Sequence, residues 1–119
     1  MKPNKNWIQK WEMGVNKQRE EDISLQLIEY FIEFWKTIKL DDKAKKTKRK
    51  YSYGLQDLGA YIVKLSIHEE DLNKTLDEIL DEVLGPVDGP LVHHDNENWQ
   101  EEFDAVCRKV YKYNLKRNA

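Results

Sequence analysis

Residues 22–38 read DISLQLIEYFIEFWKTI, and this stretch decides the fold class. Its apolar side chains recur at steps of three and four, which is the period of an α-helix with one buried face. They are Ile23, Leu27, Ile28, Phe31, Phe34, Trp35 and Ile38. Asp22 is the expected N-cap, because its carboxylate can accept hydrogen bonds from the first backbone N–H groups of a helix. The stretch therefore predicts a long helix that begins near residue 22.

Four further segments show the same helical period. Their predicted apolar faces are Trp7, Ile8, Trp11 and Val15 in residues 6–17; Tyr51, Leu55, Leu58, Ile62 and Leu65 after residue 42; Leu72, Leu76, Ile79, Leu80 and Val83 in a fourth segment; and Trp99, Phe103, Val106, Cys107 and Val110 in the last. No segment alternates with period two, so no sheet is expected. The chain contains 4 Trp, 6 Tyr and 3 Phe, whose large rings can fill a small core. We predict an all-α, single-domain bundle of about five helices with an aromatic-rich core, over residues 1–119.

Local signals predict where the later helices begin and end. Residues 66–69 read SIHE, a pattern that is typical of a capping box at a helix start. Gly85-Pro86 is expected to end that fourth helix, and the last helix is expected to start at Asp95 or Asn96. Residues 85–96 are therefore predicted to form the one long connection.

Cysteine content and hydropathy indicate the cellular compartment in which the protein is expected. The single Cys107 cannot form a disulfide within the chain, which favours a reducing environment. No stretch has the apolar length of a membrane span, and no apolar run follows the N-terminal residues as it would in a secretory signal. We therefore expect a cytoplasmic protein with no membrane partner.

Residues 43–50 form a strongly basic segment, which we call the basic segment. Six of its eight residues are cationic, namely Lys43, Lys45, Lys46, Lys48, Arg49 and Lys50. The chain has a formal net charge of −2, and without these six cations the rest would carry −8. One short segment thus attracts anions that the remainder of the molecule repels.

Two interpretations of the basic segment remain open. Cations near a helix N-terminus oppose the macrodipole by about 0.3–1 kcal/mol each, which suggests a functional reason such as phosphate binding. Tyr53 could then stack on a base, whereas Tyr51 belongs to the apolar face and is expected in the core. Alternatively, the segment is solvated and balances the seven acidic residues between Glu69 and Glu82.

One spacing within this region resembles that of a known family. Thr47, Tyr51, Leu55 and Leu58 follow a predicted helix that ends near Ile38. Their spacing is similar to the Thr–Tyr–Leu pattern in the helical core-binding domain of tyrosine recombinases. The resemblance implies DNA binding through basic helices, spans only residues 47–58, and assigns no site residue.

The connection over residues 85–96 is a second candidate site. Its two Gly-Pro corners are typical of a rigid loop that presents Leu91 and Val92 to a partner. The alternative is that these apolar side chains cover one end of the bundle. His93 and His94 are candidates for contact with the same partner.

The histidines are also candidate metal ligands. His93, His94 and Asp95 are adjacent, and His68 lies elsewhere, so the spacings of three or four residues that a helical metal site requires are missing. We expect no metal and no cofactor. Cys107 lies on an apolar face and is expected to be an inert, buried thiol.

The predicted fourth helix is acidic. Asp77 and Asp81, like Glu78 and Glu82, are like charges four residues apart, which mildly destabilise an isolated helix. Acid–base chemistry would require a cleft here, so a solvated face or a docking strip for a basic partner is favoured. That partner could be the basic segment of a second copy.

No phosphate-binding loop, nucleophile elbow or dinucleotide fingerprint occurs in the chain. The leading hypothesis is a small, non-enzymatic interaction or regulatory protein that binds a protein partner, or itself, through charged surfaces. The alternative is a nucleic-acid-binding protein that uses residues 43–50, and an enzyme comes third.

Overall fold

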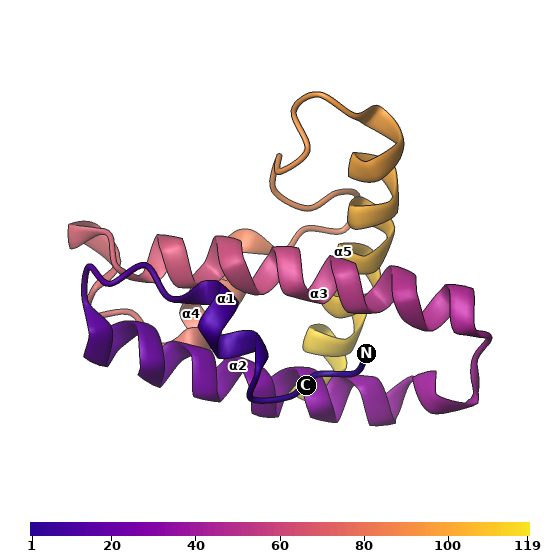
Figure 1. Cartoon of the computed structure of the whole chain (residues 1–119), viewed down its shortest axis with the longest axis horizontal. Helices are drawn as coiled ribbons and strands as arrows, with labels where there is room; N and C mark the ends of the chain where they lie inside the picture. The colour runs from indigo at the N-terminus through magenta and orange to yellow at the C-terminus, as the bar shows by residue number, and fades with distance from the viewer.

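The computed structural model describes residues 1–119 as five α-helices and two 3-10 turns, without a β-strand (Figure 1). The helices are α1 (Trp7–Trp11), α2 (Lys17–Thr37), α3 (Lys45–Ser66), α4 (Leu76–Val83) and α5 (Glu97–Arg117), with 3-10 turns at Leu40–Asp42 and Glu69–Asp71. The long helices α2 and α3 run antiparallel, α1 lies across them, and α5 crosses α3 steeply (Figure 1). The predicted all-α bundle is confirmed.

The core is a single cluster of 23 buried hydrophobic residues, in which aromatic rings of separate helices meet edge to face. Trp11 of α1 packs on Phe31 of α2 with ring centroids 6.2 Å apart. Tyr113 of α5 contacts both Tyr30 and Phe34 of α2, at 5.4 and 5.5 Å. Such pairs add to the stabilisation from buried area, and they confirm the predicted aromatic-rich core.

The first predicted helix is wrong beyond its first turn. α1 ends at Trp11, and Val15, which was expected on its buried face, is 73% exposed. Gly14 adopts a positive φ of 73°, which turns the chain out of the helix. The buried carboxylate of Glu20 then accepts hydrogen bonds from all four backbone N–H groups of residues 13–16, at 2.6–3.1 Å. This turn replaces the helix that the apolar spacing predicted.

α2 begins five residues earlier than Asp22, the predicted N-cap. The N-cap is Asn16, whose side-chain oxygen accepts a hydrogen bond from the backbone N–H of Arg19 at 3.2 Å. The extra turn is polar, so apolar periodicity alone gave no sign of it. Asn16 and Glu20 instead fix this helix start through backbone hydrogen bonds.

The predicted capping box at residues 66–69 is wrong. Ser66 is the last residue of α3, and its buried hydroxyl donates to the carbonyl of Val63 at 2.7 Å. The box forms one segment later, where Thr75 accepts from the backbone of Glu78 and the Glu78 carboxylate accepts from the backbone of Thr75. Leu72 lies in the connection before α4 and is exposed. The same sequence pattern therefore occurs twice, and only the second copy caps a helix.

α5 starts where the sequence predicted, with Asn96 as its N-cap. Its first turns and the preceding connection project beyond α3 as a separate lobe (Figure 1). Trp99 lies in this projecting part and is 60% exposed, so its predicted place on the buried face is wrong. The apolar spacing of α5 extends to Trp99, but the buried part of this face begins only one turn later in the sequence, at Phe103.

Side chains of α5 hold the connection over residues 85–96 in place. Gln100 accepts hydrogen bonds from the backbone N–H groups of Val92 and His93, at 3.0 and 2.8 Å. A Cβ on Gly89 would lie 2.5 Å from the sulfur of Cys107, so only glycine fits this approach. The connection is thus packed on α5 over most of its length.

Candidate functional site

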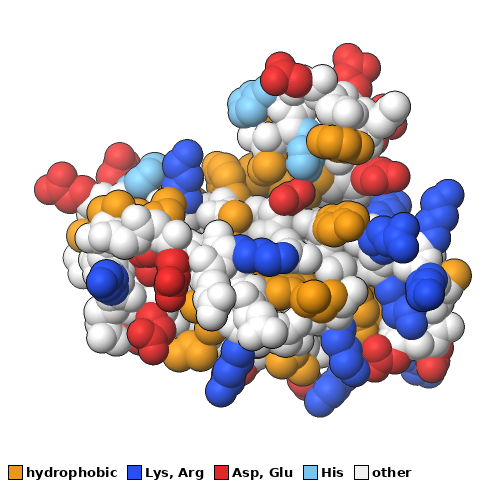
Figure 2. All heavy atoms as spheres, viewed as in Figure 1, with side chains coloured by type: hydrophobic (Ala, Val, Ile, Leu, Met, Phe, Trp, Pro, Cys, Tyr) orange, Lys and Arg blue, Asp and Glu red, His pale blue; other side chains and the backbone are white.

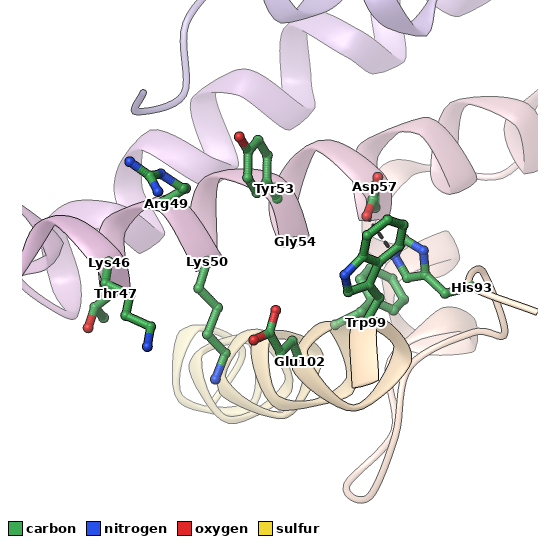
Figure 3. Close-up of a pocket in the computed structure, with 11 residues that line it drawn as sticks. Lys46, Thr47, Arg49, Lys50, Tyr53, Gly54, Asp57, His93, Trp99 and Glu102 are labelled. Atoms are coloured by element: carbon green, nitrogen blue, oxygen red, sulfur yellow. Dashed lines mark hydrogen bonds and ion pairs between the residues drawn. The ribbon is translucent and has the colours of Figure 1, made fainter. Parts of the chain in front are cut away.

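A groove of about 690 Å³ lies between the first half of α3 and the first turns of α5 (Figure 3). We call it the α3/α5 groove. Its volume is typical of sites that bind small ligands or parts of larger ones. Its lining residues are Lys46, Thr47, Arg49, Lys50, Tyr53, Gly54, Asp57, His93, Trp99, Glu102 and Phe103.

Helical geometry places one face of α3 along the groove. The α3 residues that line it recur at steps of three and four, from Lys46 to Asp57, and therefore share a face. A Cβ on Gly54 would lie 2.8 Å from a methyl group of Val106, so α3 and α5 are in close contact beside the groove. This contact fixes the two walls relative to each other.

The basic segment is divided between this groove and its surroundings. Lys45–Lys50 form the first turns of α3, whereas Lys43 precedes the helix. Lys46, Arg49 and Lys50 line the groove, whereas Lys43, Lys45 and Lys48 do not. Figure 2 shows Lys and Arg side chains gathered at the end of the molecule where α3 begins.

None of the six cations forms an ion pair within the chain. The first turn of α3 contains no acidic residue, and its N-cap, Ala44, offers no side-chain hydrogen bond. The cations therefore lie at the positive end of the helix macrodipole without an ion-pair partner or a side-chain cap, at a cost of about 0.3–1 kcal/mol for each one in the first turn.

Two aromatic side chains border the same groove. Tyr53, a sequence-predicted candidate, is 63% exposed, and Trp99 projects from α5 on the opposite wall (Figure 3). Tyr51 instead packs on Phe34 with ring centroids 6.1 Å apart, and burial raises the pKa of its hydroxyl. Tyr51 is therefore half-buried against the core, on the apolar face where the sequence placed it.

At the far end of the groove, a histidine of the connection meets an aspartate of α3. His93 Nε2 lies 2.9 Å from Asp57 Oδ2 (Figure 3). The imidazole ring also packs edge-on against Trp99 and Phe103, with centroids 5.9 and 6.0 Å away. This contact joins the projecting lobe to α3 and closes one end of the groove.

The other candidates of the connection do not reach the groove. Leu91 and His94 are exposed outside it, and Val92 packs against the core. The two interpretations of the connection thus apply to different residues, since Val92 covers the core and Leu91 does not. His68 is exposed after the opposite end of α3. No group of three or more His, Cys, Asp or Glu side chains is arranged to hold a metal ion.

Six of the groove residues were not among the candidates predicted from sequence, and three of them, Asp57, Trp99 and Glu102, bear on ligand binding. Asp57 follows Tyr53 by four residues and Lys50 by seven, so helical spacing alone places it on the basic face of α3. The sequence predicts Trp99 in the core because it continues the register of Phe103. Glu102 carries no sequence signal that separates it from its acidic neighbours.

The acidic residues of α4 are largely engaged within the chain. Asp77 pairs with Arg117 at 3.1 Å, and Glu82 pairs with Lys74 at 2.7 Å. Glu78 forms the capping box. The predicted docking strip therefore offers few unpaired carboxylates to a basic partner.

Cys107 offers no nucleophile. Burial raises the pKa of its thiol to about 12, so the reactive thiolate does not form near neutral pH. The groove itself provides cations for anion binding, aromatic faces for stacking and carboxylates that accept hydrogen bonds. This chemistry is suited to recognition of a phosphorylated, hydrogen-bonding ligand.

Comparison with protein-family models, curated proteins and solved structures found no match to this chain. The resemblance of residues 47–58 to recombinase core-binding domains therefore has no further support. None of the helices combines the length and apolar character that a membrane crossing requires.

Proposed function

We propose that this protein binds single-stranded nucleic acid in the α3/α5 groove. One observation carries the proposal: three cations without ion-pair partners and two exposed aromatic rings line the same groove. Phosphate contacts supply most non-specific affinity for nucleic acids, and base–aromatic stacking adds to it on single strands.

The cations are positioned to follow a phosphate backbone. Lys46 and Lys50 lie one helical turn apart on α3 and Arg49 is next to Lys50, so the three charges gather at one end of the groove. The backbone N–H groups at the start of α3 add to the same positive field. From Lys46 to Asp57 the groove follows α3 for about 16 Å, which accommodates a short run of nucleotides.

The aromatic rings favour a single strand over a duplex. Tyr53 and Trp99 border the groove from α3 and α5, and both rings are exposed, so an unpaired base could stack on either one. Figure 3 shows Trp99 beside Asp57 and His93, and Tyr53 at the rim, directed away from α5. Bases within a duplex are already stacked on one another, so their faces cannot contact an aromatic side chain. We therefore expect duplexes of the same sequence to bind more weakly.

The hypothesis of a protein partner bound through acidic and basic surfaces stays a prediction. It is less favoured, because the carboxylates of Asp77 and Glu82 on α4 are paired within the chain. Self-association by charge would give an oligomer that dissociates as salt rises, which light scattering measures.

The test compares two variants that remove three cations each. The groove variant carries Lys46→Gln, Arg49→Gln and Lys50→Gln, and the off-groove variant carries Lys43→Gln, Lys45→Gln and Lys48→Gln. Both lose the same charge, so general electrostatic attraction falls equally. Fluorescence anisotropy with short labelled RNA and DNA oligonucleotides measures affinity between about 50 and 200 mM salt.

We expect the wild-type affinity to fall steeply with salt. In the groove variant, the slope of log K against log salt should be shallower by about 2, because three phosphate contacts are lost. The off-groove variant should bind much more strongly than the groove variant. Equal losses in the two variants, or no wild-type binding at low salt, would refute a nucleic-acid site in this groove.

A further inference from the structure

We infer that Asp57 selects guanine in the bound strand, with the guanine base stacked on Trp99. This inference rests on the proposed function and adds a base preference to it. Its starting point is that the two ends of the α3/α5 groove differ chemically. Lys46, Arg49 and Lys50 lie at one end, whereas Asp57, His93 and Trp99 lie at the other (Figure 3).

The charge difference sets the direction in which a nucleotide fits. A phosphate is attracted to the three cations and repelled by the carboxylate of Asp57. The base of the same ligand is uncharged and carries hydrogen-bond donors, so it suits the end at which a carboxylate accepts. The sugar–phosphate backbone therefore lies along the start of α3, with one base pointing toward Asp57.

The carboxylate of Asp57 is held in place before any ligand arrives. A carboxylate only accepts hydrogen bonds, so His93 donates from Nε2 to Asp57 Oδ2. The backbone N–H of His93 is itself held by Gln100, and its ring packs against Trp99 and Phe103. Oδ1 has no partner in the chain and remains an acceptor, and Oδ2 keeps a second lone pair. A fixed acceptor loses little entropy when it binds.

Trp99 contacts the same histidine. Its ring meets the His93 ring at 78°, an edge-on contact that leaves an indole face unused. The side chain is largely exposed and lines the groove. A base stacked on this face would direct an edge toward Asp57, because both residues contact His93.

Base chemistry then selects guanine. The Watson–Crick edge of guanine presents N1–H and the N2 amino group side by side, which matches the two oxygens of one carboxylate. Adenine, cytosine and uracil each place an acceptor lone pair next to their donor on that edge. Those lone pairs would face the carboxylate and be repelled, so the site discriminates by repulsion as well as attraction.

The experiment measures wild-type affinity for oligothymidines that carry one central guanine, adenine or cytosine. We expect guanine to bind about 10-fold or more tightly than adenine, in line with a bidentate base contact. Inosine, which lacks the N2 amino group, should lose most of that advantage. The analogue 7-deazaguanine keeps the Watson–Crick edge and should retain it.

Two variants test whether Asp57 is the residue that causes the guanine preference. Asp57→Asn should bind the guanine, adenine and cytosine oligonucleotides with similar affinity, because an amide presents one donor and one acceptor. Glu102→Gln removes another carboxylate of the groove and should strengthen binding of every sequence while keeping the guanine preference. Binding by wild-type protein without a guanine preference, or a preference that persists in Asp57→Asn, would overturn the inference and leave nucleic-acid binding intact. The analogues test the same contact in wild-type protein, so the outcome does not depend on how the variant folds.

Discussion

The acidic helix α4 and the basic start of α3 are both densely charged, but only α4 uses its charges to stabilise the fold. In α4, Glu78 forms a capping box, Asp77 pairs with Arg117 and Glu82 pairs with Lys74. At the start of α3 no cation has an ion-pair partner, and no side chain caps the helix. Negative charge suits a helix N-terminus and positive charge opposes it.

This difference between α4 and the start of α3 indicates which charged region has a role other than folding. A charge run that caps, pairs and complements the macrodipole is explained by stability alone. A run that opposes the macrodipole and lines a groove with exposed aromatic rings is not. The acidic and basic regions should therefore respond to mutation in opposite ways, and the following variants test that contrast from the largest expected effect to the smallest.

The most severe loss of stability is expected for Glu20→Gln. This carboxylate accepts four backbone hydrogen bonds from residues 13–16, and a neutral amide cannot replace all of them. We expect the midpoint of thermal unfolding to fall by roughly 5 °C or more. Glu21→Gln, on the exposed face of the same helix, should leave the midpoint almost unchanged and serves as the control.

The same carboxylate should make stability depend on pH. Hydrogen bonds from the backbone, with Asn16 and Met13 the largest contributors, lower the pKa of Glu20 below its usual value. A lowered folded pKa contributes stability that is present above the unfolded pKa and is lost as pH falls through the folded pKa. Urea denaturation should show a large difference between wild type and Glu20→Gln above about pH 5, which shrinks at lower pH. A difference that grows on acidification would contradict this assignment.

A moderate loss is expected for Thr75→Ala, which removes the capping box of α4. The free energy of unfolding should fall by about 1 kcal/mol. Thr37→Ala is the matched control, because Thr37 donates only to the carbonyl of Glu33 near the exposed end of α2. Urea denaturation measures both variants, and equal effects would show that the box does not stabilise α4.

A small gain is expected at the start of α3. Lys45→Glu places a negative charge in the first turn and relieves repulsion among the cations, so the free energy of unfolding should rise by roughly 0.5–1 kcal/mol. The same substitution at Lys36, in the last turn of α2, should have the opposite sign. If Lys45→Glu destabilises the protein, the cations at the start of α3 contribute to folding stability, which would contradict the contrast drawn with α4.

Apolar periodicity predicted the bundle but not its polar details. Most apolar residues predicted for α2 and α3 are buried, and Ile38, Tyr51 and Leu65 are half-buried against the core, because burial of large side chains outweighs other terms over a long helix. Apolar periodicity did not predict the starts of α2 and α4, because hydrogen bonds to the backbone determine them. Asn16 and Glu20 extend α2 through a polar turn, and Thr75 rather than Ser66 caps the next helix. Neither the start of α2 nor the cap of α4 alters the pattern of apolar residues, so that pattern could not reveal them.

The candidate site was predicted in part. The basic segment and Tyr53 were identified from sequence, and the structure places half of the cations beside Tyr53 in one groove. Trp99 and His93 reach the groove because α5 crosses α3 and the connection packs on α5. That arrangement depends on contacts such as the close approach of Gly89 to Cys107, which no local pattern encodes.

The most direct test of the central claim measures two properties of the groove variant, in which Lys46, Arg49 and Lys50 become glutamine. If these cations serve a ligand and not the fold, its free energy of unfolding should equal or exceed that of wild type, while its affinity for single-stranded oligonucleotides falls about 100-fold or more. A variant that loses more than about 1 kcal/mol of stability and keeps its affinity would contradict the account.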